Sequence, residues 1–442
     1  MRLLIIDEKG CALDFAMRAQ RDDHEVRHFI KQDDKHKHIG KGLVHVVDDF
    51  KPWTRWADVI FAADNVKYLR DMQAARNDGH TGIIAATEET ASWELDRAVG
   101  QRVLRKHGIG TIPFREFNDY ESAIRYVKKE DRRFVSKPSG NVEDKALSYV
   151  SKCPEDMVYM LQRWKELGKL KAPFILQEFI EGSEMAVGAF HGPGGFNEGW
   201  CENWEFKKLM NGDLGVATGE QGTVVRWVRQ SKLARKVLAP LVNELTRLNY
   251  IGYIDVNCIV DDKGNAWPLE FTMRPGWPTF NIQLALLKGD SVEWLQQLTN
   301  GKDARIWIYD CVAIGVVMSV PDYPYSHVTR KEVTGIPVYG IKPSLWEHVH
   351  PCEMMLGEAP MKIGGDIKNM PMPVTAGDYV LLMTALANTV RDAANTVYRR
   401  LDSLIVPNSP MYRTDIGRRL GKQLPKLQAK GYATGLIYSL TS

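Results

Sequence analysis

Strand-like and helix-like segments alternate through the first hundred residues, and this alternation limits the possible fold more than any other feature of the chain. Short apolar runs typical of strands occur at RLLIID (2–7), HEVRHFI (24–30), ADVIFAAD (57–64) and TGIIAAT (81–87). Helix-like stretches lie between them, at CALDFAMRAQRDD (11–23) and VKYLRDMQAARNDG (66–79). Because strands that alternate with helices favour parallel pairing, we expect a doubly wound parallel sheet in this part of the chain.

The middle of the chain reads differently. One amphipathic helix is expected over 92–108 and one long helix over 232–249, with a glycine-rich region at 191–222 between them. The segment 250–271 reads as a hairpin, because two apolar runs flank the turn DDKGN. After residue 305 the sequence turns to strands and prolines and ends in a polar helix.

Length and composition limit the class of protein. A chain of 442 residues suggests about two to four domains, and 44% apolar with 26% charged residues is typical of a folded soluble protein. No apolar run is long enough to cross a bilayer, and the N-terminus MRLLIIDEKG resembles a strand rather than a signal peptide, so we expect a cytoplasmic protein. A net charge of +3 gives no reason to expect a nucleic-acid or membrane partner. The six cysteines form no CxxC pair, which argues against a zinc cluster or a disulfide framework.

Two carboxylates in the expected hairpin form the sharpest chemical signal. Asp255 lies within the first strand and Glu270 ends the second, so pairing through the turn predicts that they lie side by side on one sheet face. Oxygen ligands of this kind suit magnesium that holds nucleotide phosphates. The alternative is a pair of edge carboxylates that face water, which the apolar neighbours make less attractive.

The stretch FVSKPSGNVEDK (134–145) ends a strand with a lysine, a glycine and a second lysine. An unpaired buried ammonium is costly, so Lys137 and Lys145 on either side of Gly140 suit an anion at the mouth of a sheet. A surface hairpin whose lysines face water is the alternative from these residues alone.

Three weaker signals accompany these. Main-chain groups at the strand end near Glu178 are suited to an adenine edge, and Glu184 to ribose hydroxyls. The glycines of TGEQGT (218–223) would let backbone amides approach an anion, although most such loops are only loops. Arg274, on the turn after Glu270, could hold a carboxylate or phosphate, or could pair with Glu270.

Taken in order, these motifs resemble the ATP-grasp superfamily and, over nearly the whole chain, the glycinamide ribonucleotide synthetase (phosphoribosylamine–glycine ligase) family. The segments that carry the resemblance are FVSKPSGNVEDK, QEFIEGSE, KLMNGDLGVATGEQGT, LEFTMRPG and YRTDIGRRL. The resemblance assigns the following residues by function: to ATP, Lys137, Gly140, Lys145, Glu178, Phe179, Ile180 and Glu184; to catalysis, Arg274 and Lys208; to substrate, Asp213, Thr218, Gly219 and Gly222; to the metal, Asp255, Glu270 and Thr272.

The resemblance also implies an architecture of α/β and α+β type. It comprises an N-terminal doubly wound domain (1–105), a two-lobed ATP-grasp module (106–305) with a lid near 138–150, and a C-terminal β-rich domain (306–442). ATP with Mg²⁺ or Mn²⁺ would lie between the lobes. A substrate carboxylate would attack the γ-phosphate to give an acyl phosphate, and an amine would then displace phosphate. The implied partners are a small carboxylate and a small amine, and the protein would be a monomer or a homodimer.

The sequence departs from the family's pattern at three places. The first strand runs into DEKGCALDFA instead of a Gly-Arg-Glu-His turn, Asp144 and Ala146 replace glycines beside Lys145, and Thr272 stands where an asparagine is usual. Three hypotheses follow: a glycine ligase of purine biosynthesis, a diverged ligase that joins another amino acid to another amine, possibly in nucleotide modification, and a non-catalytic ATP-binding protein. Retention of both lysines and both acids argues against the third. The acids Asp7 and Glu8, expected near a helix N-terminus, predict that a phosphate-bearing amine is a poor substrate.

Overall fold

A parallel sheet forms the N-terminal part of the protein, as the alternation of segments predicts. The computed structural model describes residues 1–138, 148–169, 173–301, 305–325 and 331–440. The sheet has the order β3-β2-β1-β4-β5, and all of its pairings are parallel. Its elements are β1 (Arg2–Ile6), α1 (Leu13–Arg21), β2 (Glu25–Phe29), β3 (Val46–Val47), β4 (Val59–Ala62), α2 (Leu69–Asn77) and β5 (Ile83–Ile84). The doubly wound expectation is therefore confirmed for this region.

The predicted single helix at 92–108 is wrong, because two helices occupy this stretch: α3 (Glu88–Leu95) and α4 (Arg97–Lys106). Asp96 breaks the run, since its backbone is extended (φ −113°, ψ 103°) and its carboxylate accepts from the N–H groups of Ala98 and Val99. An aspartate that can cap a helix from outside competes with a helical position inside one.

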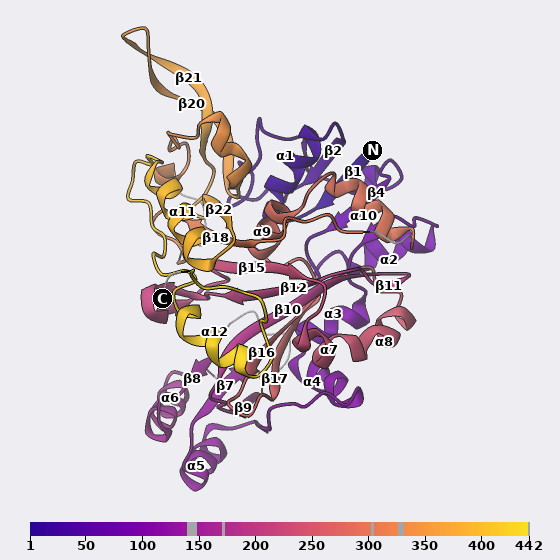
Figure 1. Ribbon diagram of the computed structural model, residues 1–442, viewed down its shortest axis with the longest axis vertical. Coiled ribbons are helices and arrows are strands. Elements are labelled where there is room, and N and C mark those ends of the chain that lie inside the picture. Colours follow the sequence, from indigo (N-terminus) through magenta and orange to yellow (C-terminus); the bar gives the residue numbers. More distant parts are fainter. Residues whose placement is uncertain (139–147, 170–172, 302–304, 326–330, 441–442) are drawn as a thin grey trace.

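A small lobe follows, built on a four-stranded sheet of order β6-β9-β7-β8. Its elements are β6 (Phe114–Phe117), α5 (Tyr120–Glu130), β7 (Phe134–Pro138), β8 (Tyr149–Val150), α6 (Pro154–Glu166) and β9 (Phe174–Glu178). In Figure 1 this lobe stands apart at the lower end of the molecule, with α5 and α6 on its outer side. Phe134, Phe174 and Leu161 form the centre of its own apolar core.

A large antiparallel sheet unites the rest of the chain, with the path β17-β16-β10-β12-β15-β18-β22-β19. Its strands are β10 (Ser183–Gly192), β12 (Trp200–Glu205), β15 (Gly222–Val228), β16 (Gly252–Val260), β17 (Ala266–Thr272), β18 (Val312–Met318), β19 (Val349–Pro351) and β22 (Leu381–Ala387), and β11 (Gly195–Phe196) pairs with β10. The predicted hairpin is β16 and β17. The glycine-rich region, read from sequence as an interruption, contributes β12 and the small hairpin β13 (Lys208–Met210) and β14 (Leu214–Ala217).

Helices cover both faces of the large sheet. They are α7 (Lys232–Val237), α8 (Val242–Arg247), α9 (Thr279–Leu286), α10 (Ser291–Thr299), α11 (Val390–Asp402) and α12 (Leu420–Ala429). The long helix predicted at 232–249 is wrong, because Pro240 lies in a 3₁₀ turn (Ala239–Leu241) that separates α7 from α8. Proline lacks the N–H that a continuous helix needs there. Over the described residues, no helix is both long and apolar enough to span a membrane.

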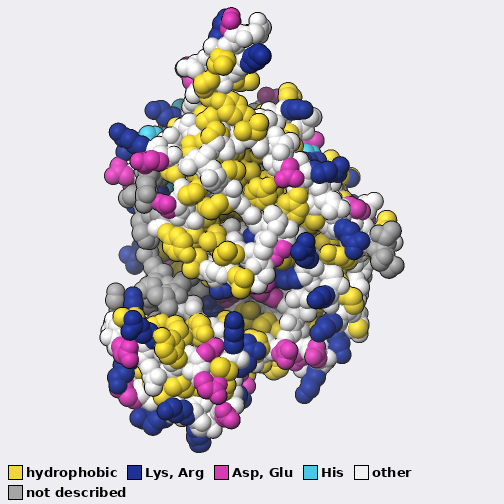
Figure 2. Space-filling view, turned by 90° about the vertical axis from the view of Figure 1, so that its left-hand side faces the viewer, with side chains coloured by type: hydrophobic (Ala, Val, Ile, Leu, Met, Phe, Trp, Pro, Cys, Tyr) yellow, Lys and Arg dark blue, Asp and Glu magenta, His cyan; other side chains and the backbone are white. Residues whose placement is uncertain are grey.

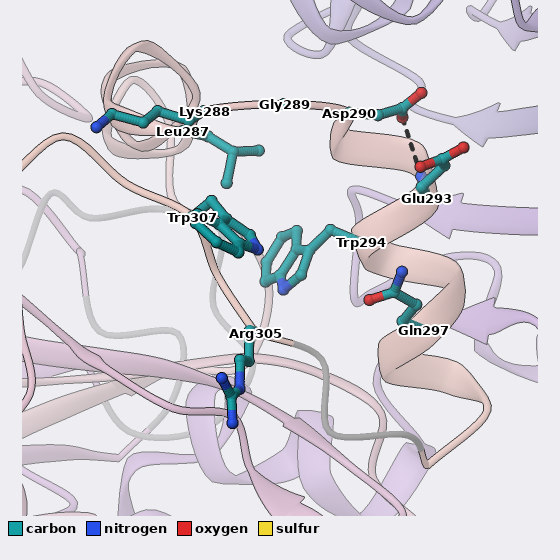
Figure 3. A pocket seen from close by; sticks show the side chains of 9 residues that line it. All are labelled: Leu287, Lys288, Gly289, Asp290, Glu293, Trp294, Gln297, Arg305 and Trp307. Carbon is teal, nitrogen blue, oxygen red and sulfur yellow. Dashed lines mark hydrogen bonds between the residues drawn. The ribbon is translucent and has the colours of Figure 1, made fainter.

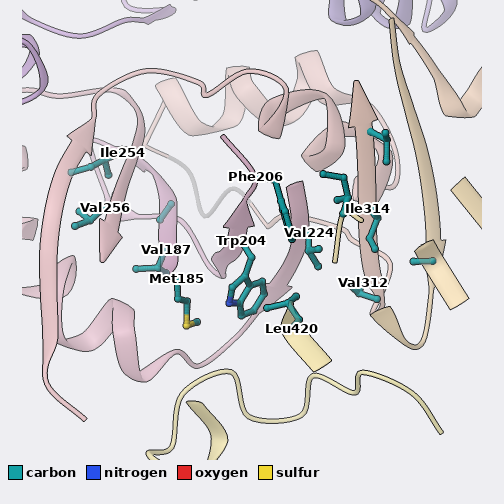
Figure 4. Packing of buried hydrophobic residues seen from close by; sticks show 14 of the residues in the cluster. Met185, Val187, Trp204, Phe206, Val224, Ile254, Val256, Val312, Ile314 and Leu420 are labelled. Carbon is teal, nitrogen blue, oxygen red and sulfur yellow. The ribbon is translucent and has the colours of Figure 1, made fainter. Parts of the chain in front are cut away.

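Alternation along the strands of the large sheet divides its two faces. On one face, Met185 and Val187 of β10 and Ile254 and Val256 of β16 belong to one apolar cluster with Trp204 and Leu420, as Figure 4 shows. The intervening residues of the same strands point to the opposite face, because side chains alternate along a strand. That opposite face carries the polar side chains described next.

One further element projects from the body. The hairpin β20 (Met354–Ile363) and β21 (Asp366–Thr375) extends away from the small lobe, at the top of Figure 1.

Candidate active site

A row of polar side chains crosses the large sheet where it faces the small lobe. In the strand register, Ala186 of β10 lies opposite Asn203 of β12 on one side and Asn257 of β16 on the other. Asn257 is in turn opposite Glu270 of β17. The small side chain of Ala186 therefore leaves two amides and one carboxylate on the same face of the sheet. Figure 2 shows a cleft above the small lobe, with acidic and basic side chains on its floor.

A second row carries Asp255, so the predicted pairing of Asp255 with Glu270 needs correction. Asp255 lies opposite Thr272, and Glu270 lies opposite Asn257. A bulge after Asn257 shifts the register by one residue, which keeps Glu270 on the same face as Asp255 but in the neighbouring row. The Asp255 carboxylate accepts from Asn203 Nδ2 (2.8 Å) and from the Tyr253 hydroxyl (3.1 Å). Burial, with a smaller contribution from Glu205, raises the pKa of Asp255 to about 7.

Lys207 lies at the centre of the acidic residues. Its Nζ is 2.8 Å from Glu205 Oε2, 3.1 Å from Glu270 Oε1 and 3.7 Å from Glu184 Oε1. Burial alone would lower the pKa of Lys207, but the three carboxylates outweigh it and raise that pKa well above its usual value. Lys207, assisted by Arg97, holds the pKa of Glu270 well below its ordinary value against the effect of burial. The site is thus a lysine held between carboxylates.

Asn257 forms hydrogen bonds with two of these acids, Glu184 and Glu205. Its Nδ2 donates to Glu184 Oε1 (2.8 Å) and to Glu205 Oε2 (3.0 Å), while its Oδ1 is buried without a hydrogen-bond partner in the structure. Such an oxygen beside two carboxylates is suited to a hard cation. Among the described residues, no three acidic, histidine or cysteine side chains already have the arrangement of a metal site. The oxygen donors Glu205, Glu270 and Asn257 nevertheless fit the chemistry of Mg²⁺ once the Lys207 ammonium moves aside.

Lys137 reaches the same cleft from the small lobe. Its Nζ donates to Gln177 Oε1 at 3.0 Å, and the register of β7 against β9 makes the two residues diagonal neighbours on the same face of that sheet. Burial, followed by the charge of Arg97, lowers the pKa of Lys137 to about 7, although Glu270 opposes the shift. Gly140 and Lys145, predicted to continue this phosphate site, lie outside the described residues.

The predicted adenine segment follows β9. The Glu178 carboxylate pairs with Arg132 at 3.0 Å, and the Arg133 guanidinium lies 3.5 Å from the ring centroid of Phe179. The N–H groups of Glu178 and Phe179 donate to the carbonyl oxygens of Pro113 and Arg133. Ile180 is half-buried directly after them. Their contact with adenine stays a prediction.

The glycine-rich segment is folded around Lys207. Thr218 donates to the Lys207 carbonyl through both its N–H (2.8 Å) and its hydroxyl (2.9 Å), which fixes the backbone from which Lys207 projects. Asp213 is shared by Arg413 (2.9 Å) and Arg419 (3.3 Å), so its observed role is to anchor this loop to the C-terminal segment YRTDIGRRL.

Gly219 and Gly222 differ in their surroundings. A Cβ at Gly219 would meet nothing within 4 Å, whereas one at Gly222 would lie 2.6 Å from the Gly315 carbonyl. Gly222 is therefore required for β15 to approach β18, and Gly219 leaves its loop open to a ligand. Lys208, predicted as catalytic, lies on β13, where its carbonyl accepts from Arg413; the lysine among the carboxylates is Lys207.

Arg274 does not pair with Glu270. Its Nη2 lies 3.2 Å from Glu94 Oε1, and Glu94 Oε2 also accepts from Asn65 and from the Met273 N–H. The Glu94 carboxylate raises the pKa of Arg274. Its effect outweighs that of burial, which alone would lower this pKa. The arginine is therefore held rigidly at the boundary between the N-terminal sheet and the large sheet.

The first turn of the N-terminal sheet is filled by its own acids. Asp7 Oδ2 accepts from the Ala12 N–H at 2.5 Å, just before α1, and lies 3.4 Å from His28 Nε2. Glu8 Oε1 lies 2.6 Å from Lys67 Nζ and 3.4 Å from Lys31 Nζ. Only 4% of Asp7 and 5% of Glu8 is exposed. This turn is the usual anion site of such sheets, and here a carboxylate already takes its donors.

A separate pocket of about 470 Å³ lies between α10 and the segment 305–307. Figure 3 shows Trp294 and Trp307 next to one another in its wall. Asp290 at its rim caps α10 and pairs with His24 at 2.7 Å. None of the sequence-predicted site residues lines this pocket.

Sequence reasoning missed Lys207, Glu205, Asn257 and Arg97. The signal for one of them was present, because in WCENWE the buried Trp204 separates Asn203 from Glu205, as happens when one face of a buried strand is functional. Arg97, which donates to Glu270 Oε2 at 3.0 Å, lies far away in the sequence and gave no local signal.

Comparison with known proteins agrees with this geometry. Residues 96–279 match the family model described as phosphoribosylglycinamide synthetase, ATP-grasp (A) domain. The phosphoribosylamine–glycine ligase of Ralstonia nicotianae is 25% identical over 348 residues, which span 76% of this chain and 78% of that protein. The structure of the phosphoribosylamine–glycine ligase from Thermotoga maritima matches with a TM-score of 0.69 at 17% identity, covering 94% of this chain and 100% of that one. An L-amino acid ligase from Bacillus licheniformis matches with a TM-score of 0.57 at 14% identity, covering 92% and 98%. The fold predicted from the motifs is confirmed.

Proposed function

We propose that this chain, an ATP-grasp ligase similar to the phosphoribosylamine–glycine ligases, joins a small carboxylate to a small amine through an acyl phosphate. The fold, the family match and the curated relatives make it an ATP-dependent ligase of this kind. The identities of the carboxylate and the amine are the proposed part.

The observation that carries the proposal is the Lys207 ammonium between Glu205 and Glu270, facing Lys137 across the cleft. A protein that only bound ATP would not need two lysines and two carboxylates at one point. A phosphoryl transfer does need them, because negative charge accumulates on the transferring group and must be offset by fixed cations.

The proposed reaction has two steps. In the first, a carboxylate oxygen of the substrate bonds to the γ-phosphorus, the bond to the β-phosphate oxygen breaks, and ADP leaves. Lys137 and Lys207 would neutralise the phosphate oxygens, and Arg274, held by Glu94, would orient the carboxylate. Glu205, Glu270 and Asn257 Oδ1 are the groups that would hold Mg²⁺ or Mn²⁺, which when bound supplies further positive charge to the phosphates.

In the second step the amine nitrogen bonds to the acyl carbon, the carbon–oxygen bond to phosphate breaks, and the amine proton leaves with phosphate or solvent. Neither step needs a serine or cysteine of the protein as a nucleophile. The six cysteines are buried or half-buried, and the thiols with resolved shifts have raised pKa values, mainly through burial.

The test separates activation of the carboxylate from its transfer. ADP release is measured with a panel of amino acids, each with hydroxylamine as a general amine, and the hydroxamate is quantified. We expect equal amounts of ADP and hydroxamate with at least one amino acid. ADP release that no carboxylate stimulates would contradict the ligase proposal.

A second candidate keeps this chemistry but changes the amine, and Asp7 and Glu8 favour it. A phosphorylated amine would have to place its phosphate against two buried carboxylates, one of which already accepts the Ala12 N–H. Like charges that are brought close together repel. We propose that the amine partner is neutral or cationic at this end, as in a diverged ligase acting on another amine.

A further inference from the structure

The projecting hairpin β20–β21 has one face that is exposed along its length and mixes apolar with charged side chains. Cross-strand pairing places Leu356, Glu358, Pro360 and Lys362 of β20 on the same face as Pro371, Asn369 and Ile367 of β21, and we call this set the arm face. All seven residues are exposed, and Ile367 is 76% exposed. The opposite face is covered near its base, where Ala359, Met372 and Val374 pack with Tyr339.

A two-stranded ribbon in water is marginal without a further layer. The base of this hairpin is held by backbone bonds, from Leu356 N–H to the Lys41 carbonyl (2.9 Å) and from Val338 N–H to the Pro373 carbonyl (3.2 Å). The outer half extends beyond these contacts, as Figure 1 shows. A partner that covers the arm face would supply the missing layer.

The edges of the hairpin are closed to strand addition. Leu356 and Pro373 form an outward-pointing pair, because their main-chain groups bond to residues outside the hairpin. Because outward-pointing and inward-pointing pairs alternate along the hairpin, the backbone nitrogens of Pro360 and Pro371, which carry no hydrogen, also face outward. Prolines at such positions leave the hairpin intact but block a further strand. The arm can therefore bind through its face and not through its edges.

The arm face is complementary to itself. Pro360 and Asn369 are cross-strand partners. Suppose that a second arm lies face to face on the first, in the reverse direction and centred on this pair. On each strand, a residue before the pair then lies opposite the residue equally far after it in the second arm. Glu358 then lies over Lys362 of the second arm and Ile367 over Pro371, and the same two contacts recur on the other side of the axis. A twofold contact of this kind uses one patch twice. We propose that two copies of this chain associate through the arm face, with their arms antiparallel.

This arrangement leaves both active sites free. The arm and the small lobe lie at opposite ends of the molecule in Figure 1, so the cleft beside the small lobe stays open when arms pair. Because the patch is small, we expect a dimer whose population rises with concentration.

Sedimentation velocity over roughly 1 to 200 µM chain tests the proposal. We expect a concentration-dependent dimer for the unchanged protein and a dissociation constant raised about tenfold or more by Ile367→Asp, which places a charge against Pro371 of the second arm on both sides of the axis. Tyr159→Asp, at a 62% exposed tyrosine on α6, is the matched control and should leave the dimer unchanged. ADP release per chain should be the same in all three proteins.

A charge exchange makes the test specific to the twofold geometry. Glu358→Lys and Lys362→Glu should each weaken the dimer about two- to fivefold, and the double variant should recover most of the loss. A monomer at every concentration, which would leave the face to some other partner, overturns the proposal. So does a dimer that Ile367→Asp does not weaken, or a double variant no better than the singles.

Discussion

The cleft face of the large sheet and the first turn of the N-terminal sheet are both rich in charge, yet they treat an anion in opposite ways. In the cleft, carboxylates surround Lys207, and a second ammonium, that of Lys137, lies nearby with a pKa of about 7. In the first turn, Asp7 and Glu8 are themselves the anions, paired with a backbone N–H and two lysines. On the proposed function, the cleft would exchange its internal ion pairs for phosphate and a metal, whereas the turn has already satisfied its donors.

On the proposed function, this difference separates the two halves of the reaction. The cleft holds the charges that phosphoryl transfer would need, while the first turn holds carboxylates where the phosphate of a phosphorylated amine would have to sit. Each experiment below either removes a charge from the cleft or asks what the first turn accepts.

The largest effect is expected for Glu270→Gln, which removes one carboxylate charge at constant volume. Lys207 and Arg97 would lose their shared partner, and ADP release should fall on the order of 10²- to 10³-fold or more. The melting temperature should change by only a few degrees, and Glu166→Gln, at an exposed glutamate of α6, should keep full activity. Undiminished ADP release from Glu270→Gln would remove this residue from the site.

Adjacent lysines give the next comparison. Lys207→Met should reduce ADP release about 10²-fold, because its ammonium is the cation between Glu205 and Glu270. Lys208→Met should cost less than about threefold, since β13 holds it through its backbone carbonyl and not through its side chain. Equal losses in the two variants, measured by the same assay, would mean that the structure does not distinguish them.

A smaller effect is expected for Lys137→Ala. Loss of a charge-assisted hydrogen bond to phosphate should weaken ATP binding by about 1–3 kcal/mol in calorimetry. Lys169→Ala, at an exposed lysine of the same lobe, is the control. Unchanged ATP affinity in Lys137→Ala would mean that Lys137 does not bind ATP and is only a residue of the strand.

The pH dependence of ATP binding should follow the same lysine. Because the pKa of Lys137 is lowered to about 7, the free protein holds it neutral above that pH, and ATP must restore its proton on binding. The association constant should therefore fall as the pH rises from about 7.5 to 9, by at most about tenfold per unit. Lys137→Arg stays charged throughout and should bind ATP with little change over this range. A flat profile in the unchanged protein would contradict the lowered pKa.

The fold was largely predictable from the sequence, and the reasons are local. Apolar runs such as RLLIID separated by helical segments leave few alternatives to a parallel sheet. The errors came where one residue overrides a pattern. Asp96 and Pro240 each divide a stretch that is periodic enough for one helix, through a cap and through a missing N–H.

The site was predictable in type but not in register. Glu270 and Lys137 were placed at the cleft from strand ends, because residues after a buried strand lie at the edge of a sheet. Asp255 was assigned to the wrong row because a bulge cannot be read from the turn that precedes it. Lys208 was named as catalytic, which stays a prediction, whereas the structure places the neighbouring Lys207, between β12 and β13, among the carboxylates.

Steady-state kinetics with glycine and phosphoribosylamine tests most directly whether the chain has kept the nucleotide end and changed the amine end. The unchanged protein is measured beside the double variant Asp7→Gly/Glu8→Gly, with hydroxylamine as the uncharged comparison amine. We predict that the unchanged protein turns over the glycine and hydroxylamine pair but uses phosphoribosylamine poorly, and that the double variant gains on phosphoribosylamine alone. A kcat/KM on the order of 10⁴ M⁻¹s⁻¹ or more for phosphoribosylamine with the unchanged protein would contradict this and make it a glycine ligase of the ordinary kind.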